Sequence, residues 1–289
     1  MAKRPFGVST HLYRQRPLSR AHLLEIAAHG FETVELFATR THFDFHSAAA
    51  IGDLQQWLGE AGLSLHAIHA PVGEGNRAGG WTGALSLASA DPAARARALG
   101  EAEQALYIAR RIPASVFVAH IGLPRWQRPS PAGPTETRAA DTRDGARRSV
   151  EALAGVAAPL GVRVAVEVIQ NELSRAGSLA HFIEADLEQD GVGICLDFGH
   201  AHLDGDLNDA IEIVSEHLAA VHVHDNRGHA DDHLLPFEGT IDWPAALTGI
   251  QKVGYEGPLM LEIEGRGPSK QTLQHAKRAR KRMERLLAH

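Results

Sequence analysis

The side chains that could do chemistry in this chain are histidines and carboxylates at the ends of short apolar runs. The sequence holds 18 histidines, and imidazole is both the commonest metal ligand and the usual acid or base near neutral pH. Mixed histidine and carboxylate ligands suit Zn, Mn, Fe or Co better than Ca or Mg. The pattern therefore predicts a site for a divalent transition metal. Its candidate residues at or just past the ends of these runs are His69, His120, Glu167, Asp197, His222, His224 and Glu262.

A second group of the same residue types lies shortly after two of these runs. His200 follows Asp197 by one short turn, and Asp231 and His233 lie in the segment after His224. The single cysteine, Cys195, excludes an intrachain disulfide framework and a cysteine-rich structural zinc site. Any ion would therefore be held by imidazole and carboxylate groups.

The apolar runs alternate along the whole chain with longer segments of helical spacing. Helix starts are expected after Ser19, Asp91, Ser178 and Asp242. Helix ends are expected at Gly30, Gly62, Gly161, Gly191 and Gly254. The expected strands are Phe6–Thr10, Thr33–Phe37, Leu65–Ala70, Val116–His120, Arg163–Val168, Val192–Asp197, Ala220–His224 and Leu259–Ile263.

Eight strand–helix units in 289 residues predict an α/β protein, a single (β/α)8 barrel domain over residues 1–289. A doubly wound open sheet is the alternative, but its GxGxxG fingerprint is missing. The glycines of residues 73–80 follow a strand without starting a helix, so we expect a flexible loop there. Residues 121–141 carry four prolines around Trp126, and a loop this long is expected to form a lid, with Trp126 near a substrate.

In such a barrel the carboxyl ends of all strands open on one face, where active sites lie. The candidate residues are therefore expected to meet at one mouth. Because strand side chains alternate between faces, Glu167 shares a face with Ala165 and Asp197 shares one with Cys195, and both acids should point inward. His222 and His224 also share a face, so that one could be a ligand and the other a substrate contact.

Several of these segments resemble the xylose-isomerase-like TIM-barrel superfamily, and within it the sugar phosphate isomerase/epimerase group. The resemblance is carried by His-Ala-Pro at 69–71, Ala-His-Ile-Gly at 119–122, Leu-Asp-Phe-Gly-His at 196–200 and Leu-Glu at 261–262. Its most specific part is residues 222–243. The resemblance implies a TIM barrel and a metal-dependent enzyme that acts on a small sugar.

The resemblance also implies two alternative ligand sets. Ketose 3-epimerase-like members hold one metal with two glutamates, an aspartate and a histidine, which match Glu167, Glu262, Asp197 and His222. Members similar to endonuclease IV hold three zinc ions with nine residues. These match His69, His120, Glu167, Asp197, His200, His222, Asp231, His233 and Glu262, all present here. The expected cofactor is thus one to three divalent ions of Mn, Zn or Co.

We expect isomerase or epimerase chemistry on a sugar or sugar phosphate. A metal on the carbonyl and hydroxyl oxygens of the substrate would acidify the neighbouring C–H and stabilise the enediolate. Glu167 and Glu262 would act as base and acid, and His200 would donate a hydrogen bond to a substrate oxygen. Arg227 resembles an arginine that contacts substrate oxygens in epimerases.

Two alternatives stay open. The first is a polynuclear zinc phosphoesterase similar to endonuclease IV, in which Glu167 bridges two ions. The second is a metal-binding barrel without catalysis.

Composition narrows the classes of partner. A net charge of −6 and a pI near 6.3 give no global attraction to nucleic acid, which disfavours but does not exclude that partner. No stretch approaches the ~18 to 20 apolar residues of a membrane span. We therefore expect a cytoplasmic protein with a small-molecule substrate and no membrane partner, and a homo-oligomer is compatible with the sequence.

Overall fold

A computed structural model describes residues 4–77, 80–124, 142–188, 190–265 and 267–288 of the chain. Eight parallel strands close into a barrel in the order β1-β10-β9-β8-β7-β6-β3-β2, which confirms the predicted (β/α)8 barrel. Every predicted strand is present, and no bound differs by more than two residues. The strands are β1 (Phe6–Ser9), β2 (Thr33–Phe37), β3 (Ser64–His69), β6 (Val116–Ala119), β7 (Arg163–Glu167), β8 (Val192–Asp197), β9 (Leu218–Val223) and β10 (Leu259–Leu261).

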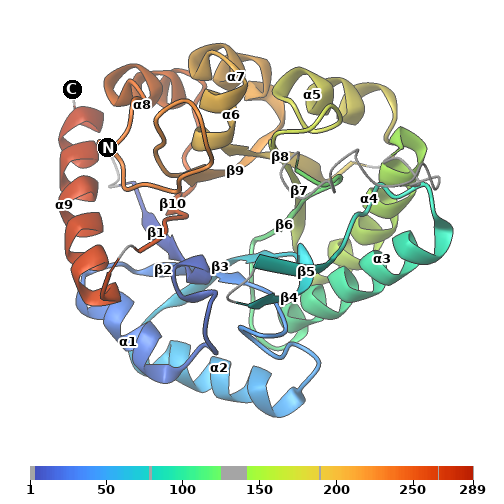
Figure 1. The fold of residues 1–289 in the computed structure, drawn as a ribbon, viewed down its shortest axis with the longest axis horizontal. Coiled ribbons are helices and arrows are strands. Elements are labelled where there is room, and N and C mark those ends of the chain that lie inside the picture. The colour runs from blue at the N-terminus through green and yellow to red at the C-terminus, as the bar shows by residue number, and fades with distance from the viewer. Residues whose placement is uncertain (1–3, 78–79, 125–141, 189, 266, 289) are drawn as a thin grey trace.

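The helices form a ring around these strands, as Figure 1 shows. None of those in the described ranges combines the length and the apolar character needed to cross a membrane. They are α1 (Arg20–Ala28), α2 (Ala48–Ala61), α3 (Pro92–Leu106), α4 (Arg143–Ala157), α5 (Ala176–Ala185), α6 (Phe198–Asp204), α7 (Leu207–Ile213), α8 (Trp243–Lys252) and α9 (Ser269–Leu287).

Most predicted helix boundaries agree with the structure. Ser19, Asp91 and Asp242 are the N-caps of α1, α3 and α8. The five predicted glycines all have positive φ, and four of them close a helix before the next strand. The end predicted at Gly191 is wrong, because α5 ends at Ala185. The start predicted after Ser178 is also wrong, because α5 begins at Ala176, three residues before the expected first residue Leu179. The turn before it is closed by Asn171, whose Oδ1 accepts hydrogen bonds from two backbone N–H groups.

The flexible loop predicted at residues 73–80 is also wrong. This segment belongs to an antiparallel hairpin of β4 (Gly73–Arg77) and β5 (Gly80–Ala84). Its ladder is made by backbone groups, which the glycine-rich sequence does not reveal. The predicted lid falls largely in residues 125–141, and these, with Trp126, lie outside the described residues.

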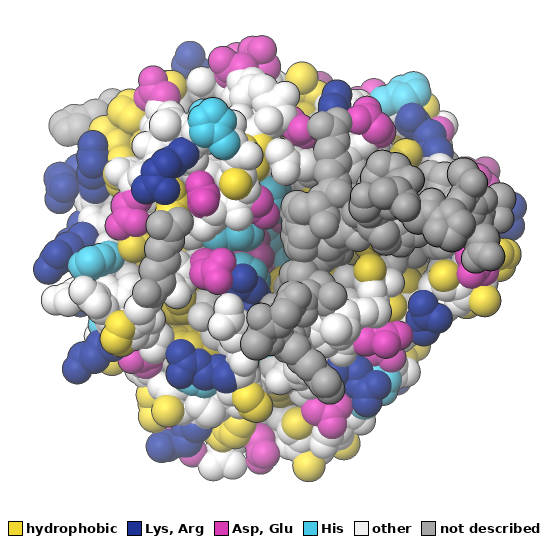
Figure 2. Space-filling model, viewed as in Figure 1, with side chains coloured by type: hydrophobic (Ala, Val, Ile, Leu, Met, Phe, Trp, Pro, Cys, Tyr) yellow, Lys and Arg dark blue, Asp and Glu magenta, His cyan; other side chains and the backbone are white. Residues whose placement is uncertain are grey.

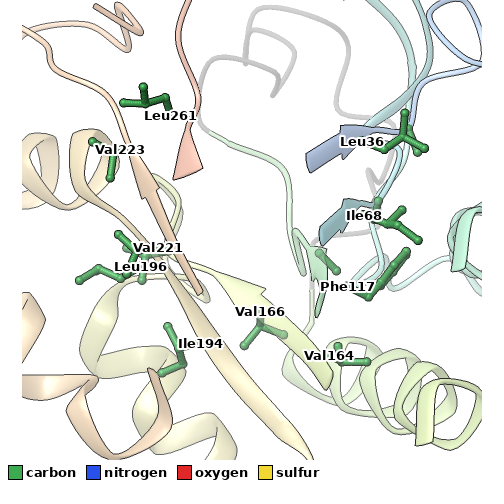
Figure 3. Packing of buried hydrophobic residues seen from close by; sticks show 14 of the residues in the cluster. Leu36, Ile68, Phe117, Val164, Val166, Ile194, Leu196, Val221, Val223 and Leu261 are labelled. Carbon is green, nitrogen blue, oxygen red and sulfur yellow. The ribbon is translucent and has the colours of Figure 1, made fainter. Parts of the chain in front are cut away.

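The strands bury different residues on their two faces. Leu36, Phe117 and Leu196 belong to a large cluster between the strands and the helices, part of which Figure 3 shows. A separate, smaller cluster fills the barrel interior with Ala67, Val116, Val118, Ala165, Cys195 and Ala220. Since alternate strand residues share a face, the acids that follow Ala165 and Cys195 on that face also lie in the interior. The small side chains below leave room for polar groups at the mouth.

Candidate metal centre

A pocket of about 520 Å³ opens at the carboxyl ends of the strands. Figure 2 shows histidine and acidic side chains gathered around the hollow at the centre of this face. The candidate residues that line the pocket are His69, His120, Glu167, His200, Asp231, His233 and Glu262. The structure therefore brings together side chains from the ends of separate strands.

The four residues of the predicted single-metal set form one compact group. Ligand atoms of Glu167, Asp197, His222 and Glu262 all lie within 4.8 Å of one another, and all four residues are buried. Nδ1 of His222 lies 3.0 Å from Oε1 of Glu167 and 2.9 Å from Oε2 of Glu262. One imidazole nitrogen and carboxylates from two other strands thus face a common point.

Glu167 also belongs to a second group, with two histidines. Its Oε2 lies 3.0 Å from Nε2 of His69 and 3.0 Å from Nε2 of His120. The other oxygen, Oε1, faces His222. The two oxygens of one carboxylate are therefore divided between two groups of donors, as in a carboxylate that bridges two ions.

A third group lies beside the first and is built around Asp231. Oδ2 of Asp231 lies 3.1 Å from Nε2 of His200 and 3.3 Å from Nε2 of His233, and His224 completes the group. His233 holds its place with a φ of 45°, which is unusual for a residue with a Cβ. All nine residues of the larger predicted set therefore meet at the mouth of the barrel.

Three of the histidines are oriented by the backbone. Nδ1 of His69 donates to the carbonyl of Ala70 at 2.8 Å, and Nδ1 of His200 donates to that of Val168 at 3.0 Å. Nδ1 of His233 donates to the carbonyl of Glu262 at 2.8 Å. In the neutral form of each ring the proton therefore stays on Nδ1, and the Nε2 lone pair is left for a ligand or a metal.

Neighbouring charges shift the pKa values in the centre. Burial raises the pKa of Glu167, but electrostatic interaction and hydrogen bonds with His222 and His120 outweigh it and hold that pKa well below its usual range. Burial lowers the pKa of His69, whereas the hydrogen bond and charge of Glu167 more than compensate and raise it to about 9. The pKa of His233 is likewise lowered by burial but raised by Asp231 to about 9.

The donor set fits a divalent cation. Among the described residues, no lysine or arginine forms an ion pair with Glu167, Asp197 or Glu262, so that histidines are their charged partners. Oδ2 of Asp197 and Oδ1 of Asp231 are buried and have no hydrogen-bond partner in the described part of the chain. Buried carboxylates with unpaired oxygens are costly unless a cation compensates them.

Two of the three predicted substrate contacts, His224 and Arg227, are not among the described residues that line the pocket. His224 is fully buried, with its Nε2 2.9 Å from Oδ1 of Asp197, because it packs beneath Gly199 at the start of α6. Arg227 is exposed and is not among the lining residues. Trp126 lies outside the described residues.

Several residues of the centre were not predicted. Glu35, in the middle of β2, is fully buried, and its Oε2 lies 2.9 Å from Nε2 of His222. His11, just after β1, lines the pocket with its ring centroid 4.7 Å from that of His233. Arg14 lines it too, paired with Glu264 at 3.0 Å. The sequence did offer one signal, because Glu35 is an acidic residue within a strand that is otherwise uncharged.

Comparison with known proteins gives a family and a fold. Residues 23–287 match a family model described as xylose isomerase-like TIM barrel. The uncharacterized protein y4fM of Sinorhizobium fredii is 45% identical over 75 residues, 25% of this chain and 24% of that protein. The L-ribulose-5-phosphate 3-epimerase UlaE of Escherichia coli is 26% identical over 122 residues, 42% of each chain. This chain thus spans less than half of either relative.

Similarity to a solved structure extends over nearly the whole chain. A D-tagatose 3-epimerase-like protein superimposes with a TM-score of 0.78 and 22% sequence identity, covering 98% of each chain. At this identity the similarity establishes a shared fold.

Proposed function

Because the chain belongs to the xylose isomerase-like TIM-barrel family, we propose that it is a divalent-metal-dependent isomerase or epimerase of a sugar or sugar phosphate. The observation that carries the proposal is the group of Glu167, Asp197, His222 and Glu262 at the mouth of the barrel. The names of UlaE and of the D-tagatose 3-epimerase-like protein support sugar epimerisation as the reaction class.

These four residues would hold the ion. A divalent metal bound there supplies a Lewis acid for the carbonyl and hydroxyl oxygens of the substrate. Mn, Zn and Co all suit a set of one imidazole and three carboxylates.

The protein itself would move the proton. Glu167 comes from β7 and Glu262 follows β10, and both carboxylates lie within 3.0 Å of the same nitrogen of His222. In the proposal Glu167 accepts the proton from the carbon next to the carbonyl. Glu262 takes up a proton from solvent and returns it to the opposite face, which inverts that carbon, and Glu167 releases its proton to solvent before the next turnover.

His200 would orient the substrate at the side of the pocket. Its Nε2 faces Asp231, and its Nδ1 is fixed by the carbonyl of Val168. A ring held in this way can make a hydrogen bond to a substrate oxygen at a defined position.

The test is exchange of the carbon-bound proton with solvent. Protein as purified is incubated with ketoses and their phosphates in D₂O, and deuterium incorporation is followed by NMR. We expect exchange at one carbon, reduced at least about 100-fold in E167Q and E262Q preparations that still contain metal. Exchange that is undiminished in both metal-containing variants would contradict the proposal.

A second candidate, a polynuclear phosphoesterase, is supported by one specific observation. The two oxygens of Glu167 face different donor groups, one of which contains His69 and His120. Hydrolysis of a panel of phosphate esters, read as phosphate release from monoesters and as strand cleavage of abasic DNA, with zinc or manganese present, tests this candidate. No hydrolysis of any ester would remove its support.

A further inference from the structure

Glu35 is a buried carboxylate that the proposed reaction does not use. It occupies the middle of β2 and has no exposed surface. Its neighbours Val34 and Leu36 belong to the outer hydrophobic cluster, so the alternation of strand side chains turns Glu35 into the barrel interior. There its Oε2 lies 2.9 Å from Nε2 of His222, on a strand 187 residues later in the sequence.

His222 is held differently from three other histidines of the centre. Those three donate Nδ1–H to backbone carbonyls and turn Nε2 toward Glu167 or Asp231. His222 is reversed, with Nδ1 toward Glu167 and Glu262 and Nε2 toward Glu35. Its outer partner is therefore a carboxylate side chain, which a substitution can remove.

We propose that Glu35 is a positioning residue for the metal centre. Its carboxylate accepts a hydrogen bond from Nε2–H of His222, which leaves the Nδ1 lone pair of that ring for the ion. This inference rests on the proposed metal site. A carboxylate behind a histidine ligand fixes the tautomer and the ring orientation, and its loss typically lowers metal affinity about 10- to 100-fold.

The surroundings of Glu35 indicate that it serves binding rather than stability. Together with Glu167, Asp197 and Glu262 it places four buried carboxylates around the single ring of His222. Oε1 of Glu35 has no hydrogen-bond partner among the described residues. Burying a further carboxylate in such a cluster costs free energy when no cation is bound. Removing the charge of Glu35 while keeping its volume and one acceptor oxygen, as in E35Q, should therefore leave the metal-free protein as stable as before, or more stable.

The experiment compares zinc affinity and metal-free stability in the same variants. Zinc dissociation constants of wild type, E35Q and E35A are measured by competition with a chelating indicator, and thermal unfolding is followed without metal. The matched control is E25Q. Glu25 on α1 accepts hydrogen bonds from Tyr13 at 2.9 Å and Ser269 at 2.7 Å, away from the centre.

We expect E35A to bind zinc about 10- to 100-fold more weakly than wild type. Metal-free E35Q, which keeps the side-chain volume and an acceptor oxygen, should unfold at a temperature no lower than that of wild type. E35Q keeps an acceptor oxygen and should lose less affinity than E35A. E25Q should instead lower the unfolding temperature and leave zinc affinity unchanged. In zinc-loaded wild type, long-range ¹H–¹⁵N NMR should show His222 protonated at Nε2.

Two results would overturn the role of Glu35 alone. The first is zinc binding by E35A within about twofold of a wild type that does bind zinc. The second is a metal-free E35Q protein that unfolds at a lower temperature than metal-free wild type. If wild type binds no zinc, cobalt or manganese, the metal site proposed above fails and this inference fails with it.

Discussion

Oδ1 of Asp197 accepts a hydrogen bond from the backbone N–H of His200 at 2.8 Å. Asp197 is the last residue of β8 and the N-cap of α6, so this contact fixes where the helix that carries His200 begins. Its second oxygen, Oδ2, is buried and lies 3.9 Å from Nδ1 of His222. Asp197 therefore caps α6 with one carboxylate oxygen and faces the metal centre with the other.

Substitution of Asp197 should separate its two roles. D197N and D197A both remove the charge, but only D197N keeps an oxygen for the cap. We expect zinc affinity to fall in both variants, while D197A is less stable than D197N by about 1 kcal/mol because it also loses the cap. Urea unfolding of the metal-free proteins measures the difference. Equal stability of the two variants would show that the cap does not hold α6.

Removal of metal should destabilise the protein. Without an ion, Glu167, Asp197 and Glu262 stay buried together, with histidines as their charged partners. A ligand that binds only the folded state stabilises it by about 2.7 kcal/mol at 100 times its dissociation constant. Thermal unfolding before and after chelation, and again after manganese or zinc is restored, should show a reversible shift. D197A serves as the control, and a shift as large in D197A as in wild type would speak against this site.

Substitution of Gly199 by alanine tests the position of His224. A Cβ at Gly199 would lie 1.9 Å from Cε1 of His224, so the ring or the start of α6 must move in G199A. We expect a loss of about 1 to 3 kcal/mol in the free energy of unfolding, as for other overpacked sites. The matched control is G155A in α4, where a Cβ meets nothing within 4 Å. G155A should gain about 0.5 to 1 kcal/mol, and similar effects of the two substitutions would refute the packing of His224 described above.

His42 should make stability depend on pH. Burial lowers its pKa to about 4, and its Nδ1 donates to the carbonyl of Arg16 at 2.7 Å. In the unfolded chain the pKa is about 6.5, so between roughly pH 6.5 and 4 only the unfolded state binds this proton. The contribution of His42 to the free energy of unfolding is fully present above about pH 6.5, its pKa in the unfolded chain. That contribution falls by about 1.4 kcal/mol per pH unit as the pH drops through this window.

The comparison variant for this prediction is H42N, whose amide can still donate to Arg16. Urea unfolding at pH 7, 6 and 5 in the presence of a chelator should give a shallower loss of stability in H42N than in wild type. Parallel pH dependences of the two proteins would disprove the contribution of His42.

The sequence predicts the barrel and most of the centre for physical reasons that can be named. Parallel strands buried on both faces read as continuous apolar runs, and their alternation turns Glu167 and Asp197 inward beside Ala165 and Cys195. The parts it did not predict depend on tertiary closure. Glu35 meets His222 only because β2 and β9 enclose one interior.

The different positions of His222 and His224 have a similar cause. The two residues share a strand face, but they lie at different heights along the barrel. His222 lies level with Asp197 in the strand register, whereas His224 lies above it against Gly199. Residue spacing within β9 does not give its register against β8. It also does not show which backbone carbonyl orients a histidine ring.

Elemental analysis of the protein purified without added metal tests the proposed metal site most directly. The proposed function predicts about one divalent ion of Mn, Zn or Co per chain, held by Glu167, Asp197, His222 and Glu262 and lost from D197A. About three zinc ions per chain would contradict the single-metal isomerase or epimerase and favour the phosphoesterase. Protein without any bound metal, unable to take up added zinc, cobalt or manganese, would contradict both.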